Sequence, residues 1–126
     1  MSAPILIVDD NEDNLKLTQM LLEYEGYDVE TAADAEQALK IVQTCRPSLI
    51  LMDLQLPGMD GLQLTRRLRA MPALRKVPVV ALTAYAMQTD EENARAAGCD
   101  GYITKPIHTR SFAALIRQYV APKQAD

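Results

Sequence analysis

The chain has 126 residues, a net charge of −4 and 48% apolar residues. This length fits one domain, which buries roughly two-thirds of the surface of its unfolded chain and needs no metal or disulfide to fold. The acidic balance argues against a nucleic-acid or anionic-membrane surface, since both need a basic patch.

No apolar run approaches the ~20 residues of a membrane span, and the N-terminus has no signal-peptide pattern. Cys45 and Cys99 lack metal-ligand spacing, so we interpret them as reduced thiols. We therefore expect a single cytoplasmic domain over residues 1–126, with a core at about 4–120 and a frayed tail at 121–126.

Strand and helix patterns alternate five times along the chain. The first strand, Ile5–Val8, is apolar throughout, and the helix after it stops at Gly26, since glycine supplies the left-handed conformation common at helix ends. The second strand, 28–32, alternates polar and apolar residues, as a half-exposed edge strand does. The first helix has three residues at helical spacing for its core side: Leu17, Leu21 and Tyr24.

The second helix opens at Asp34, a favourable N-cap with Gln37 three residues on. The third strand, 49–52, is apolar at every position, which predicts helices on both of its faces. The third helix is expected to be capped by Asp60. Its core side is Leu64, Leu68 and Met71.

The fourth strand is expected over residues 79–82, and Thr89 with Glu92 predicts a capping box for the fourth helix. That helix has few apolar residues, so we expect it to be weakly anchored. The fifth strand, 102–104, is short. The fifth helix has the clearest apolar stripe in the chain: Phe112, Leu115, Ile116, Tyr119 and Val120.

Five strand–helix units imply parallel strands joined by right-handed crossovers. The continuously apolar strands belong in the centre of the sheet, and the alternating or short ones belong at its edges. We therefore predict an α/β flavodoxin-like (βα)5 three-layer sandwich with strand order 2-1-3-4-5. Its topological switch point lies between strands 1 and 3, and ligands bind past the carboxyl ends of strands at such a point.

Polar residues follow four of the strands: Asp9 and Asp10, Asp53, Thr83, and Lys105. Carboxylates collected at one edge repel one another unless a cation intervenes, and an oxygen-rich set suits Mg²⁺. Asp53 can act as a nucleophile on phosphorus to give an acyl phosphate. Mg²⁺ and Lys105 would meet the charge on the phosphoryl oxygens, and Thr83 would donate a hydrogen bond.

A plainer alternative is that Asp9 and Asp10 only cap the helix after them and that Lys105 is a solvated surface lysine. The meeting of the two aspartates with Asp53 at a switch point favours the site, and for Lys105 its place at a strand end just before Pro106 does so. The single histidine, His108, is expected to have no catalytic role. The chain lacks a G-x-G-x-x-G and a P-loop motif, which argues against a dinucleotide site and direct use of ATP.

In this order and spacing, the residues resemble the receiver domain of two-component response regulators, the CheY-like family. The resemblance covers about residues 4–120 and is carried by Asp9-Asp10, Asp53, 57–61, Thr83-Ala84 and Lys105-Pro106. Residues 51–57 and 81–87 look most like single-domain DivK-type regulators and the receivers of hybrid histidine kinases.

The resemblance implies that Asp53 accepts a phosphoryl group from a phosphohistidine on a histidine kinase or phosphotransfer protein. It also implies Mg²⁺ bound by Asp9, Asp10, Asp53 and the backbone carbonyl of Gln55. Such a protein is a signalling switch or relay that catalyses only its own phosphorylation and dephosphorylation, not a conventional enzyme.

The resemblance further makes Tyr102 a switch aromatic that turns inward when Thr83 moves toward the phosphoryl group. The face formed by the fourth helix, the fifth strand and the fifth helix would then engage a downstream protein. Gln55 and Tyr85 match positions that tune the phosphoryl lifetime, and the bulky Tyr85 predicts slow hydrolysis. We expect a monomer or a weak phosphorylation-dependent dimer.

Two other function classes stay open at this point. A metal-dependent phosphatase with an aspartyl nucleophile usually has a second aspartate two residues on, where this chain has Gln55. A receiver-like interaction module that is never phosphorylated would not need the complete set of Asp53, Thr83 and Lys105. The sequence identifies neither the kinase, nor the target, nor whether the chain is part of a longer protein.

Overall fold

The computed structural model describes residues 4–54, 61–83, 88–104 and 109–120. The strands are β1 (Ile5–Val8), β2 (Val29–Ala32), β3 (Leu49–Asp53), β4 (Val79–Thr83) and β5 (Gly101–Thr104). The helices are α1 (Glu12–Tyr24), α2 (Ala35–Thr44), α3 (Gly61–Arg69), the short 3-10 helix η1 (Pro72–Leu74), α4 (Gln88–Ala97) and α5 (Thr109–Val120).

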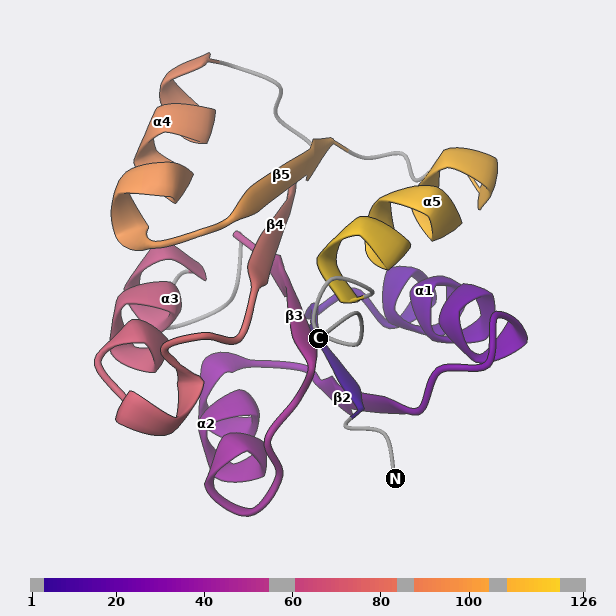
Figure 1. Cartoon of the computed structure of the whole chain (residues 1–126), viewed down its shortest axis with the longest axis horizontal. Helices are drawn as coiled ribbons and strands as arrows, with labels where there is room; N and C mark the ends of the chain where they lie inside the picture. Colours follow the sequence, from indigo (N-terminus) through magenta and orange to yellow (C-terminus); the bar gives the residue numbers. More distant parts are fainter. Residues whose placement is uncertain (1–3, 55–60, 84–87, 105–108, 121–126) are drawn as a thin grey trace.

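The five strands form one parallel sheet in the order β2-β1-β3-β4-β5. Helices α1 and α5 cover one face of the sheet, and α2, α3 and α4 cover the other (Figure 1). This arrangement confirms the predicted flavodoxin-like three-layer sandwich. The parallel direction brings the carboxyl ends of all the strands to one edge of the sheet.

The core consists of two apolar clusters, one on each face of the sheet. Along β1, Leu6 and Val8 belong to the cluster beneath α2, α3 and α4, whereas Ile5 and Ile7 belong to the cluster beneath α1 and α5. The alternation follows from the two-residue period of a strand, and it explains why a central strand is apolar at every position. In the described residues, no helix is long and apolar enough to cross a membrane.

The helix ends that the sequence predicted most directly are confirmed. Asp34 caps α2 by accepting a hydrogen bond from the backbone N–H of Gln37 at 2.8 Å. The Gln37 side chain in turn accepts one from the backbone N–H of Ala33 at 2.9 Å. Gly26, just after α1, has a φ of 94°, the left-handed conformation that glycine adopts without strain.

The predicted core side of α1 is confirmed for Leu21, which packs against the cluster beneath α1 and α5, and is wrong for Leu17 and Tyr24. Leu17 is 44% exposed and Tyr24 is 89% exposed, whereas Thr18 and Leu22 are buried. A threonine can take a core position here because its hydroxyl donates to the carbonyl oxygen of Asn14 at 2.9 Å. A search for apolar residues alone misses such a position.

Two other details also differ from the sequence predictions. Met71 does not belong to α3, which ends at Arg69; it is extended because it precedes Pro72, and the residue before a proline avoids the helical conformation. The helix α4 begins at Gln88, so the predicted cap Thr89 falls on its second residue. Asp60, the predicted cap of α3, lies outside the described residues.

Arg69 joins α3 to the amino-terminal ends of β4 and β5. The Arg69 guanidinium forms an ion pair with the Asp100 carboxylate. The same carboxylate accepts a hydrogen bond from the backbone N–H of Val79 at 2.9 Å. The same guanidinium donates to four backbone carbonyl oxygens: Gly98 at 2.9 Å, Leu74 at 3.2 Å, Arg75 at 3.1 Å and Val77 at 2.7 Å. One charged side chain thus satisfies carbonyls from η1, the segment between η1 and β4, and the residue after α4.

We expect Arg69→Ala to lower the free energy of unfolding by about 2 kcal/mol, because several backbone acceptors lose a charged donor in a site that is partly shielded from water. The measurement is the urea midpoint at an unchanged slope. Arg67→Ala, an exposed position on the same helix, is the matched control and should change stability by less than about 0.5 kcal/mol. Equal shifts for the two variants would contradict the role of Arg69.

Candidate functional site

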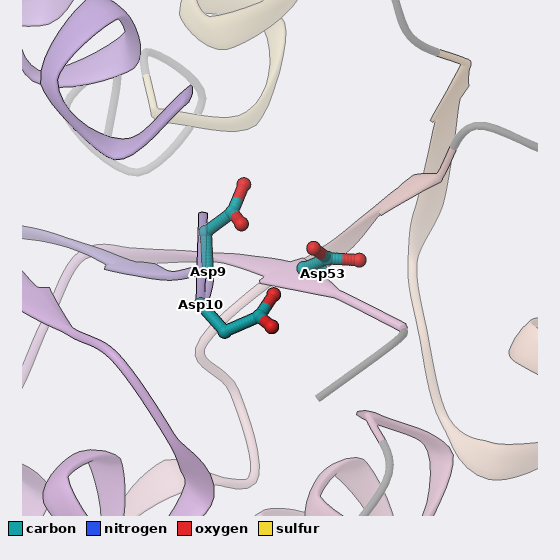
Figure 2. Close-up of side chains that lie close together, drawn as sticks. All are labelled: Asp9, Asp10 and Asp53. Carbon is teal, nitrogen blue, oxygen red and sulfur yellow. The ribbon is translucent and has the colours of Figure 1, made fainter. Parts of the chain in front are cut away.

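Three carboxylates meet at the carboxyl edge of the sheet. The register of β1 and β3 pairs Val8 with Met52, so Asp9 and Asp53 follow side by side, with Asp10 next to them. One ligand atom from each of the three side chains lies within 4.8 Å of the others. Figure 2 shows that the three side chains come from the ends of these two neighbouring strands.

The three carboxylates differ in their exposure to water. Asp9 is 1% exposed and Asp53 is 6% exposed, whereas Asp10 lies at the surface. Two buried negative charges this close repel one another and lose hydration on folding. A cation bound between the carboxylates would relieve this repulsion. Asp10 is the member of the cluster that is open to solvent.

The cap of α1 is Asn11, whose side chain accepts a hydrogen bond from the backbone N–H of Asn14 at 3.0 Å. Asp9 accepts a hydrogen bond from the backbone N–H of Asn11 at 2.9 Å, which fixes the start of the helix against the end of β1. The cap of α1 is thus Asn11 rather than Asp9 or Asp10, although Asp9 also bonds a backbone N–H at the start of the helix.

The donor set of the cluster consists of carboxylate oxygens alone. Hard cations such as Mg²⁺ prefer oxygen ligands, and Mg²⁺ is usually held by one or two carboxylates while it keeps several waters. The residues present therefore fit a magnesium ion.

The backbone around Asp53 is fixed on two sides. Asp53 ends β3 beside Leu82 of β4, and the N–H of Leu54 donates to the carbonyl oxygen of Leu82 at 3.3 Å. The N–H of Gly61, the first residue of α3, donates to the carbonyl oxygen of Leu54 at 3.0 Å. The sequence placed residue 61 in a family motif, but only the structure shows that its backbone lies against Asp53.

The other predicted site residues are described only in part. Thr83 is the last residue of β4, and the structure describes its backbone alone. Tyr102 on β5 is half-buried and packs against the cluster beneath α2, α3 and α4. Gln55, Tyr85 and Lys105 lie outside the described residues.

Comparison with known proteins identifies the family. Residues 5–117 match the family model of the response regulator receiver domain. The polar-differentiation response regulator DivK of Brucella anthropi is 43% identical over 120 residues, which cover 95% of this chain and 98% of that protein.

Two solved structures have the same fold. A CheY-like receiver domain protein from Methanospirillum hungatei superimposes with a TM-score of 0.90 at 31% identity, covering 99% of this chain and 98% of that one. The receiver domain of a sensor histidine kinase from Pseudomonas aeruginosa gives a TM-score of 0.88 at 36% identity, covering 96% and 99%. That structure has a magnesium ion coordinated in its active site cleft.

The family match covers most of the chain, and the strand order and the acidic edge are those expected from the sequence. Both cited structures are receiver domains, and the curated relative is a response regulator. The chain therefore belongs to the response regulator receiver domain family of two-component signal transduction, whose members are signalling domains rather than conventional enzymes.

Proposed function

We propose that this chain is a phosphorylation-dependent switch that accepts a phosphoryl group on Asp53 from a phosphohistidine. The donor is a histidine kinase or a histidine phosphotransfer protein. One observation carries the proposal: the carboxylate of Asp53, at the end of a central strand, lies within 4.8 Å of the carboxylates of Asp9 and Asp10. A group of carboxylates that can bind a cation next to the Asp53 nucleophile suits phosphoryl transfer.

The proposed magnesium ligands are Asp9, Asp10, Asp53 and, by family resemblance, the backbone carbonyl of Gln55. The oxygen-only donor set of the three carboxylates supports this assignment. A similar receiver domain, from a Pseudomonas aeruginosa kinase, has magnesium in its active site cleft. When bound, Mg²⁺ neutralises charge on the phosphoryl oxygens and on the carboxylates.

In the transfer step, a carboxylate oxygen of Asp53 attacks phosphorus. The P–O bond forms as the P–N bond of the phosphohistidine breaks, and its electron pair stays on the imidazole nitrogen, which takes up a proton. The product is an acyl phosphate on Asp53. By resemblance, Lys105 and Thr83 contact the transferred oxygens. The buried position of Asp53 strengthens such contacts, because low polarity reduces screening.

The output would run through Thr83 and Tyr102 to the face formed by α4, β5 and α5. Tyr102 is half-buried, so its ring is partly packed and partly in contact with water. A change of rotamer can therefore turn the ring further into the protein. Among the described side chains of α4, the buried ones are only Ala94 and Ala97, and elements with few buried contacts are those that move most readily. The recipient is a downstream target protein or a further phosphotransfer protein.

The acceptor is tested with Mg²⁺ and acetyl phosphate as donor. We expect the intact mass to rise by one phosphoryl group, and we expect Asp53→Asn to abolish the gain, because an amide is not a nucleophile toward phosphorus. Asp28→Asn changes an exposed carboxylate just before β2 and should leave the gain unchanged. No gain in the wild type would indicate a pure interaction module, and sustained turnover of a phosphoester would indicate a phosphatase.

The same pair of proteins tests the switch. Wild type and Asp53→Asn serve as bait under phosphorylating conditions, and a target of the switch is retained only by the wild type. Identical sets of captured proteins with and without acetyl phosphate would contradict a phosphorylation-dependent output.

The lifetime of the acyl phosphate is expected to depend on Tyr85, which matches a tuning position together with Gln55. A bulky side chain there shields the phosphoryl group from water, so Tyr85→Ala should shorten the half-life of the phosphorylated protein. The measurement is the decay of the phosphorylated mass after removal of the donor, with Tyr24→Ala, 89% exposed at the end of α1, as control. An equal half-life in Tyr85→Ala and the wild type would contradict shielding.

A further inference from the structure

The first residue of α3 touches the backbone of the proposed phosphoacceptor. A Cβ atom added to Gly61 would lie 2.6 Å from the carbonyl oxygen of Asp53 and 2.7 Å from the Cα atom of Leu54. Real Cβ atoms essentially never approach other heavy atoms this closely. Both neighbours are backbone atoms, so no rotamer change of a side chain can make room.

Gly61 is not required for its conformation. Among the described residues, positive φ values occur only at Gly26 and Gly98. Any residue can therefore adopt the backbone angles of Gly61, and what excludes a side chain there is the contact with Asp53 and Leu54. Glycine is needed at this position because a side chain would collide with the backbone of Asp53 and Leu54.

One hydrogen bond holds Gly61 against Leu54, and a second stabilises the helix turn that Gly61 begins. The N–H of Gly61 donates to the carbonyl oxygen of Leu54 at 3.0 Å, and the carbonyl oxygen of Gly61 accepts from the Thr65 hydroxyl at 2.8 Å. Thr65 is fully buried, and its hydroxyl lies 3.8 Å from the sulfur of Cys99. Burial raises the pKa of the Cys99 thiol, which therefore stays neutral beside Thr65. The bond to Leu54 holds the first turn of α3 against the end of β3, whereas the bond from Thr65 lies within α3 and stabilises the turn itself.

We propose that Gly61 is a positioning residue for the Asp53 carboxylate. Its missing side chain lets the first turn of α3 rest on the peptide unit after Asp53, which fixes the end of β3 and with it the geometry of the three-carboxylate cluster. This inference rests on the proposed role of Asp53. A methyl group at residue 61 forces the first turn of α3 and the backbone at Asp53 and Leu54 apart, and we expect part of that shift at Asp53, where a metal or phosphoryl site tolerates errors of only about 0.5 Å.

A purely structural role for Gly61 makes a different prediction. If the glycine served only the packing of α3, then Gly61→Ala would lower the free energy of unfolding but leave the folded protein with normal Mg²⁺ affinity. A positioning role predicts weaker Mg²⁺ binding in protein that is fully folded. Mg²⁺ affinity measured without a phosphodonor therefore separates the two roles.

The experiment compares Gly61→Ala with Gly26→Ala by calorimetric titration of Mg²⁺, after circular dichroism establishes that both are folded. Gly26 has a φ of 94° and nothing within 4 Å of an added Cβ, so alanine there causes backbone strain without a clash. We expect Gly61→Ala to bind Mg²⁺ on the order of tenfold more weakly than the wild type, as loss of a supporting contact at a metal site commonly does. Gly26→Ala should bind Mg²⁺ as the wild type does.

Wild-type Mg²⁺ affinity in folded Gly61→Ala would overturn the inference. Should Gly61→Ala not fold in plain buffer, it and the wild type are both titrated in trimethylamine N-oxide, which favours the folded state. Severalfold weaker Mg²⁺ binding by that variant supports the inference, and unchanged binding overturns it. If the wild type binds Mg²⁺ but takes no phosphoryl group from acetyl phosphate, the proposed function fails while the Mg²⁺ titrations still decide the role of Gly61.

Discussion

Electrostatic repulsion among three carboxylates is the constraint on which the rest of this structure depends. Asp9 and Asp53 are buried side by side at the ends of β1 and β3, and Asp10 lies next to them. Each buried charge opposes folding, and together they oppose it more strongly. The fold tolerates the cluster because the strands beneath it are apolar on both faces and are covered by helices.

The interactions at the amino-terminal edge of the sheet stabilise the fold, whereas those at the carboxyl edge form the proposed functional site. At the amino-terminal edge, Arg69 and Asp100 neutralise each other and satisfy backbone groups of η1, β4 and the residue after α4. At the carboxyl edge, like charges lie together, and Gly61 allows the backbone of α3 to approach them closely. Functional sites commonly depart from the arrangement that stability alone would favour, and the remainder of the structure compensates.

The sequence predicted those features that depend on local patterns. Continuous apolar runs indicated the central strands, and the topology rules then brought Asp9, Asp10 and Asp53 to one edge. It did not predict that Thr18 faces the core, because a buried threonine depends on a hydrogen bond that no apolar pattern reveals. The approach of Gly61 to Asp53 was equally hidden, since a glycine at a helix start indicates a turn, whereas the contact arises from tertiary packing.

The central claim is that the three carboxylates form one cation-dependent unit. The most direct measurement is urea unfolding of the wild type and of Asp10→Asn, each in EDTA and in Mg²⁺. Asp10 is exposed, so the asparagine side chain that replaces it stays hydrated in the folded state. Removal of the charge at residue 10 weakens the repulsion among the carboxylates and should make the variant more stable than the wild type in EDTA. Mg²⁺ should stabilise the wild type more than the variant, as ligand binding to the folded state requires. A less stable variant in EDTA, or equal stabilisation of both proteins by Mg²⁺, would contradict the account.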